Sequence, residues 1–104
     1  MAEFRLSEEA EAELDEIWLY VARASGSIET ATRVVENISD RFWLLARHPN
    51  IGRKRDDDLY PGIRSLLADD YVILHRVQSD DVVLILHVIH SSRDLAALLE
   101  EGNI

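Results

Sequence analysis

The stretch Tyr71–Asp94 constrains the fold most strongly, because it holds two long apolar segments separated by four polar residues. Both segments, residues 71–77 and 82–90, are rich in Val, Ile and Leu, as β-strands are. The polar connection is so short that the two strands are predicted to pair antiparallel, and we expect the hairpin to close symmetrically. Within the second segment, Val82–Ile89 is apolar on both faces apart from His87, which predicts a strand covered on both sides.

Two amphipathic helices are predicted upstream of this hairpin. The first begins after Ser7, whose hydroxyl can cap the free backbone N–H groups, and ends at Gly26. The second begins after Ser27 and ends before Pro49, which cannot continue a helix. Each helix carries apolar residues at helical spacing, and the connection between them is very short. They are therefore expected to pack as an antiparallel hairpin.

The remaining segments complete the expected element order. Two further strands are predicted from their apolar residues, at Glu3–Leu6 and Ile63–Ala68. The segment Asn50–Pro61 is predicted to be a polar loop. A last helix is predicted from the composition of Arg93–Glu101. The order β-α-α-β-β-β-α predicts an α+β fold, with a small antiparallel sheet packed on the N-terminal helical hairpin. A chain of 104 residues is expected to form one domain, residues 1–104.

Composition narrows the possible chemistry. The chain has no Cys, which excludes disulfides, thiolate nucleophiles and thiolate metal sites. Its formal net charge of −9 disfavours generic nucleic-acid binding, although residues 41–64 hold six basic side chains against three acidic ones. The N-terminus is acidic where a signal peptide would be basic, and no apolar run approaches the length of a membrane span. We therefore expect a cytoplasmic protein that contacts other proteins rather than polynucleotides.

Several polar side chains are expected on one face of the sheet. If Asp69-Asp70 is a two-residue turn, Arg64 lies directly opposite His75. Tyr71 and His90 then lie further along that same face. Such a cationic and aromatic group is suited to binding a phosphate or a protein partner. A strand His is nevertheless more often a buried structural residue than a catalyst, and Tyr71 at a strand start also fits a core-edge aromatic.

The polar residues around the hairpin resemble those of a known toxin family. Pro61-Gly62-Ile63-Arg64, the two apolar strands and the His-x-x-Arg-Asp that runs from His90 to Asp94 are similar to the ParE branch of the RelE/ParE toxins. The expected element order also matches that family, whose fold is a small antiparallel sheet packed on a helical hairpin. The resemblance covers nearly the whole chain in element order and about a third of it in specific residues.

The resemblance implies a function that rests on binding. A ParE-like toxin is expected to inhibit DNA gyrase, trap it with its DNA cut, and so block replication. It is also expected to be neutralised by a ParD-type antitoxin whose disordered tail folds on the toxin. No cofactor, no metal and no direct nucleic-acid substrate are expected. The candidate target- or partner-binding residues are Trp43, Arg64, Tyr71, His75, His90 and Arg93.

Two other functions are compatible with the same residues. A RelE-type, ribosome-dependent messenger-RNA endonuclease would use Arg64 and Arg93 as phosphate clamps and His90 as acid or base, since an imidazole ordinarily titrates near neutrality. RelE-type nucleases place a catalytic Tyr or His near the C-terminal end, whereas residues 95–104 contain neither, and this favours the ParE branch. Arg93 also fits a structural role at the start of the last helix. The third alternative is a non-toxic interaction module of the same fold.

Overall fold

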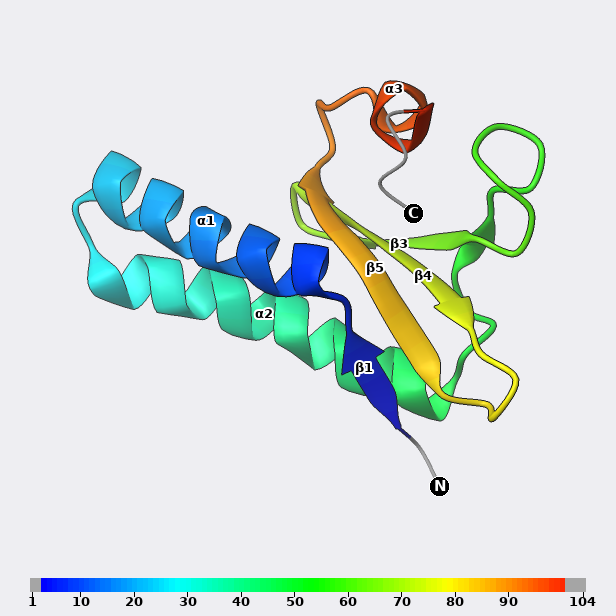
Figure 1. Cartoon of the computed structure of the whole chain (residues 1–104). Helices are drawn as coiled ribbons and strands as arrows, with labels where there is room; N and C mark the ends of the chain where they lie inside the picture. The colour runs from blue at the N-terminus through cyan, green and yellow to red at the C-terminus, as the bar shows by residue number, and fades with distance from the viewer. Residues whose placement is uncertain (1–2, 101–104) are drawn as a thin grey trace.

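The computed structural model describes residues 3–100 and has the expected α+β architecture (Figure 1). Two long helices pack against one side of a five-stranded sheet, and a short helix lies on the other side. The elements are β1 (Phe4–Leu6), α1 (Glu8–Ser25), α2 (Ile28–Arg47), β2 (Arg53–Lys54), β3 (Arg64–Ala68), β4 (Tyr71–Val77), β5 (Val83–His90) and α3 (Leu95–Glu100). The predicted order is confirmed, with β2 as an addition within the segment expected to be a loop. Glu101, which was assigned to the last helix, lies outside the described residues.

The predicted boundaries of α1 and α2 are confirmed, whereas α3 begins at Leu95, two residues after its predicted start. The Ser7 hydroxyl accepts a hydrogen bond from the N–H of Ala10 at 3.0 Å, and the Ser27 hydroxyl accepts one from Thr30 at 3.1 Å. Gly26 closes α1 in the left-handed region, with φ of 70°, where a side chain would be strained. Because the connection is so short, α1 and α2 run antiparallel, and the tip of this hairpin extends away from the sheet (Figure 1).

The sheet has the strand order β1-β5-β4-β3-β2. It is mixed rather than wholly antiparallel, because β1 pairs parallel to β5 from Phe4 opposite Val83 to Leu6 opposite Ile85. The β3–β4 register is the predicted one, with Arg64 opposite His75. A two-residue turn fixes this register, and Asp69 takes the left-handed conformation that the turn requires, with φ of 55°.

The register between β4 and β5 differs from the symmetrical closure that was expected. Symmetry would place Tyr71 opposite Val88, whereas Tyr71 lies opposite His90 and His75 lies opposite Ile85. The first cause is the turn, in which Asp81 has φ of 63° and after which β5 begins at Val83, one residue later than predicted. The second is a bulge that adds one residue to β5 between the partners of Leu74 and His75. Tyr71 and His90 nevertheless share a face, as predicted.

Two apolar clusters cover the two faces of the sheet. One fills the space between the sheet and the helical hairpin and includes Ile38, Phe42, Ile73 and Ile85. The other lies on the opposite face, where α3 contributes its one buried residue, Leu99. β5 supplies side chains to both clusters, so the prediction of a strand covered on both sides is confirmed. Within residues 3–100, no helix is long and apolar enough to cross a membrane.

Candidate functional site

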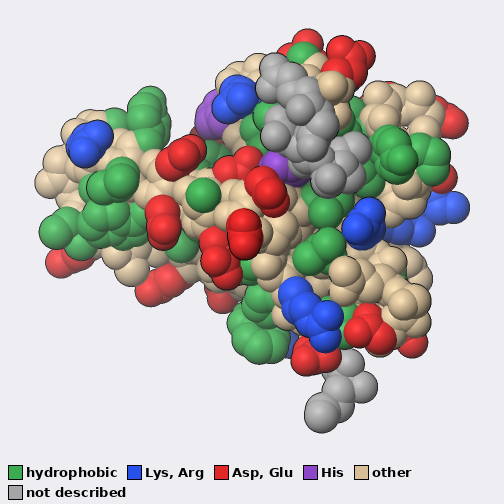
Figure 2. Space-filling model, viewed as in Figure 1, with side chains coloured by type: hydrophobic (Ala, Val, Ile, Leu, Met, Phe, Trp, Pro, Cys, Tyr) green, Lys and Arg blue, Asp and Glu red, His purple; other side chains and the backbone are tan. Residues whose placement is uncertain are grey.

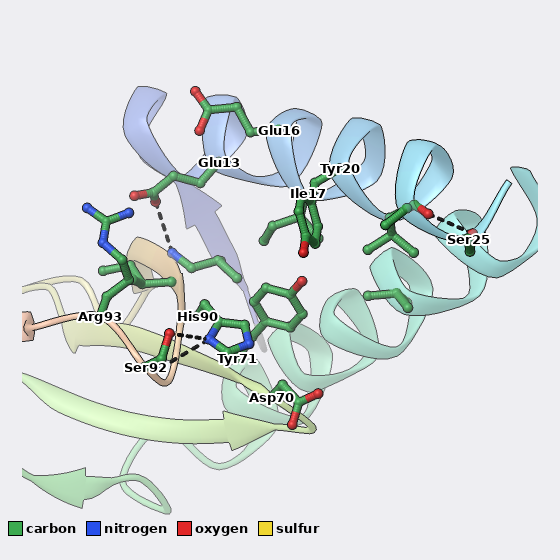
Figure 3. A pocket seen from close by; sticks show the side chains of 15 residues that line it. Glu13, Glu16, Ile17, Tyr20, Ser25, Asp70, Tyr71, His90, Ser92 and Arg93 are labelled. Carbon is green, nitrogen blue, oxygen red and sulfur yellow. Dashed lines mark hydrogen bonds between the residues drawn. The ribbon is translucent and has the colours of Figure 1, made fainter. Parts of the chain in front are cut away.

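A groove of about 870 Å³ lies between the C-terminal half of α1 and the adjacent end of the sheet (Figure 3). We call it the hairpin groove. Its walls come from α1 between Glu13 and Ser25, from Asp70 and Tyr71 at the start of β4, and from residues 88–90 with the following turn. The helical periodicity of α1 brings side chains three or four residues apart to the groove, so this wall is acidic at Glu13 and Glu16 and mainly apolar from Ile17 onward.

Three of the predicted site residues line this groove. The rings of Tyr71 and His90 are in edge-to-face contact, with centroids 5.5 Å apart and an interplanar angle of 85°. Arg93 follows in the turn after β5 and is exposed. The sequence analysis expected these side chains to gather, and the structure brings them to one place.

A local hydrogen-bond pair fixes the orientation of the His90 ring. The backbone N–H of Ser92 donates to Nδ1 of His90 at 3.1 Å, and the Ser92 hydroxyl lies 2.7 Å from the same nitrogen. Because Nδ1 accepts, the neutral ring carries its hydrogen on Nε2. The backbone N–H of Ser91 also donates to the carbonyl of Asp70 at 2.8 Å, which ties the end of β5 to the β3–β4 turn. The sheet side of the groove is therefore a fixed surface.

The other two residues expected on this face, His75 of β4 and Arg64 opposite it on β3, lie away from the groove and are structural in this arrangement. His75 is completely buried, and neither of its ring nitrogens has a hydrogen-bond partner among the described residues. Arg64 donates to the backbone carbonyls of Asn50 at 3.1 Å and Gly52 at 2.8 Å. His75 and Tyr71 are four residues apart on one strand, about 13 Å along it. The expected single cluster is thus divided into two groups.

Burial sets the protonation state of His75. It lowers the pKa of this imidazole from its ordinary 6.5 to about 4, and the positive charge of Arg64 acts in the same direction. His75 is therefore neutral at physiological pH, beneath the loop that connects α2 to β2. It does not present a charge to a ligand in this conformation.

The loop over His75 predicts the effect of one substitution. A Cβ atom added at Gly52 would lie 2.8 Å from Cε1 of His75 and 3.0 Å from the carbonyl oxygen of Ser65. Both neighbours are buried, so Gly52→Ala is expected to destabilise the protein by about 2 kcal/mol. Urea unfolding measures this loss, and Gly52→Ala should cost less stability in a His75→Ala protein than in the wild type. A Gly52→Ala protein as stable as the wild type would contradict the close packing.

Trp43 lies away from both groups, on the exposed side of α2. Its side chain is 55% exposed, and its ring packs edge-to-face on Phe4 of β1, with centroids 4.7 Å apart. The exposed part of the Trp43 ring is accessible at the surface of α2.

The sequence analysis did not single out four residues that shape the groove, Glu13, Glu16, Tyr20 and Asp70. Glu13 and Glu16 belong to the strongly acidic first half of α1, and Asp70 belongs to a turn, so all three resemble solvated surface charges. Tyr20 is 70% exposed and stands beside exposed Leu19 near the hairpin tip, where Figure 2 shows hydrophobic side chains at the left end of the molecule. No group of three His, Asp or Glu side chains within residues 3–100 could hold a metal ion.

Solved structures with a similar fold define the class of this protein. A chain of the chromosomal ParDE toxin–antitoxin system from P. aeruginosa matches with a TM-score of 0.74 and 25% identity, over 86% of this chain and 96% of that one. The toxin–antitoxin complex RelBE2 from Mycobacterium tuberculosis matches with a TM-score of 0.58 and 22% identity, over the same shares. The fold is that of the RelE/ParE toxins.

Sequence comparison then identifies the branch. Toxin ParE1 of Caulobacter vibrioides is 32% identical over 95% of this chain and 99% of its own length, and Toxin ParE1 of Mycobacterium tuberculosis is 30% identical over 88% and 92%. The profile of the ParE toxin of the type II toxin–antitoxin system parDE matches residues 4–95. The chain belongs to the ParE toxin family, and the resemblance stated from its sequence is confirmed.

Proposed function

We propose that this ParE-type toxin acts by binding DNA gyrase and is neutralised by a ParD-type antitoxin that occupies the hairpin groove. The observation that carries the proposal is the groove itself, an open surface of about 870 Å³ with apolar and charged walls. It suits a folded or folding polypeptide segment better than a small substrate. Both similar solved structures belong to toxin–antitoxin systems, which supports an antitoxin as partner.

The separation of the predicted catalytic residues favours binding over nuclease chemistry. Arg64 would have to act with His90 and Arg93 on one phosphate, but it lies at the start of β3, opposite His75, with its guanidinium on two backbone carbonyls. Nδ1 of His90 already accepts the hydrogen bonds of Ser92. A general base, a general acid and a phosphate clamp would need to converge within hydrogen-bond reach, and this arrangement does not bring them together.

The proposed target is tested with purified gyrase and purified, antitoxin-free toxin. We expect loss of supercoiling together with linear, protein-linked DNA at toxin concentrations comparable to that of the enzyme. Addition of the antitoxin in equal amount should restore supercoiling. A folded toxin that leaves gyrase unaffected while it arrests growth would remove gyrase as the target, and harmless expression without antitoxin would favour a non-toxic interaction module.

The nuclease alternative is tested by His90→Ala. The binding function predicts that a folded His90→Ala protein still arrests growth, with at most a severalfold loss of potency from the missing ring contact with Tyr71. Induction of the two proteins in antitoxin-free cells, followed by counts of surviving colonies and mapping of messenger ends, measures both activities. Messenger cleavage that disappears in His90→Ala, together with toxicity, would support the nuclease instead.

A further inference from the structure

The exposed side of α1 carries two large apolar residues near the hairpin tip. Leu19 is 45% exposed and Tyr20 is 70% exposed, although they belong to a helix whose first half is strongly acidic. Together with Glu16, Arg23 and Ala24 they line a shallow hollow of about 480 Å³, and all five residues come from α1. We call the surface formed by Glu16, Leu19, Tyr20 and Arg23 the α1 patch.

One acidic and one basic residue flank the apolar pair of the α1 patch. Glu16 lies three residues before Leu19, and Arg23 lies three residues after Tyr20, so the four side chains share one side of the helix. Seven residues separate the two charges, about 10 Å along the helix axis, which is too far for them to pair with each other. Neither charge forms an ion pair with any residue in 3–100.

The α1 patch is complementary to itself when its direction is reversed. If two copies of α1 lie antiparallel around a two-fold axis between Leu19 and Tyr20, Leu19 of each copy lies beside Tyr20 of the other. Glu16 of each copy then lies beside Arg23 of the other. A parallel arrangement would instead place Glu16 beside Glu16 and Arg23 beside Arg23. The charges therefore favour the antiparallel arrangement, in which each charge has an opposite charge beside it.

The shape of the molecule leaves room for a second copy in this orientation. The tip of the α1–α2 hairpin extends away from the sheet (Figure 1). β1 ends just before α1 begins, so in an antiparallel pair the sheet of the second copy lies past Gly26, beyond the tip of the first hairpin. Figure 3 also shows the Glu16 side chain directed away from Tyr71 and the sheet. Two copies can thus approach along α1 without contact between their sheets.

We propose that the free toxin self-associates through the α1 patch as an antiparallel, two-fold dimer. Leu19 and Tyr20 of both copies form its apolar centre, and two ion pairs between Glu16 and Arg23 flank that centre. Each copy contributes about two turns of one helix, which is less than the roughly 1,200 Å² of total area that stable complexes bury. The expected dissociation constant is therefore high, about 100 µM. Because Glu16 and Tyr20 also line the hairpin groove, the dimer covers one of its rims.

Sedimentation equilibrium of the antitoxin-free protein, from about 10 µM to about 1 mM, measures the self-association. We expect Glu16→Arg and Arg23→Glu each to weaken it at least about tenfold, because each change brings like charges together in both flanking contacts. An equal mixture of these two variants should associate within about threefold of the wild type, since every flanking contact then joins an acid to a base. Leu19→Ser should weaken the association about tenfold through loss of the apolar centre.

The matched control is Glu11→Arg, which makes the same change of charge on α1. Glu11 is exposed and lies five residues from Glu16, on another side of the helix, so its association should equal that of the wild type. Circular dichroism checks that every variant is folded. A wild type that stays monomeric at about 1 mM would overturn the proposal. So would a dimer that both charge reversals leave unchanged, or a mixture that stays as monomeric as its two components.

These measurements use the toxin alone. Their outcome is therefore independent of whether gyrase is the target or an antitoxin occupies the groove. A monomeric wild type that still inhibits gyrase would contradict the dimer and leave the proposed function intact. A dimer that responds to the charge reversals as expected would stand even if gyrase proved not to be the target.

Discussion

Unfolding in urea is expected to become easier by about 3 kcal/mol between neutral pH and pH 4, because His75 is buried as a neutral imidazole. The folded protein holds the pKa of His75 at about 4, while the unfolded chain returns it to 6.5. As the pH falls through this range, the unfolded state binds a proton that the folded state does not, so stability falls with pH. A pKa difference of about 2.5 corresponds to about 3 kcal/mol.

The matched variant for this prediction is His75→Leu. Leu fills a similar volume without a titratable group, so its free energy of unfolding should lack this part of the pH dependence. The relevant quantity is the difference between wild type and variant at pH 7.5, 6.5, 5.5 and 4.5, which cancels the titration of the carboxylates. His48→Gln, at an exposed position, is the control for the loss of a surface histidine. A difference that stays constant with pH would show that His75 is not the responsible group.

Glu13→Ala is expected to destabilise the protein by about 3 kcal/mol, although Glu13 belongs to an acidic surface helix. One carboxylate oxygen accepts the backbone N–H of Val88 at 2.9 Å, and the other lies 3.0 Å from Nδ1 of His87. β1 pairs with β5 only as far as Ile85. Beyond that point the edge of β5 has no neighbouring strand, and the Glu13 carboxylate accepts a backbone hydrogen bond from it instead. Removal of the carboxylate leaves the partly buried backbone N–H of Val88 without its acceptor, and a buried donor without a partner lowers the stability of the folded protein.

Two variants separate the hydrogen bond from the charge. Glu13→Gln keeps an oxygen that can accept from Val88 and should lose about half as much stability as Glu13→Ala. Asp15→Ala, an exposed acid in the same helix, should change the free energy of unfolding by less than about 0.5 kcal/mol. Thermal and urea unfolding of the four proteins measure the series. Equal stabilities for Glu13→Ala and Asp15→Ala would mean that the carboxylate does not support β5.

Local signals explain which parts of the fold were predictable from the sequence. Ser7, Gly26 and Ser27 each act within one helical turn of their own position, so the helix boundaries follow from the residues themselves. The two-residue turn at Asp69-Asp70 allows one register only, and Arg64 therefore lies opposite His75 as expected. These features depend on neighbours in the sequence rather than on the rest of the protein.

The features that were missed depend on distant contacts. β5 is apolar on both faces, so a bulge at Leu86 changes no visible pattern, and the shift in register left no trace in the sequence. Glu13 is one acid among many in its helix. It has a backbone partner in β5 only because β1 ends before Val88. Tyr20 and Asp70 are ordinary surface residues until the hairpin and the sheet meet at the groove. The candidate site was therefore predicted on its sheet side and missed on its helix side.

The parallel pairing of β1 with β5 also determines when the protein can acquire its activity during synthesis. Phe4 and Leu6 find their strand partners about 80 residues later in the chain, whereas the α1–α2 hairpin needs only residues that emerge early from the ribosome. The nascent chain can form its helices, but its sheet stays open until residues 83–85 have been translated and have left the exit tunnel. Nascent chains that have not reached residues 88–93 consequently lack one wall of the groove, so the proposed antitoxin surface forms only after that segment has been translated.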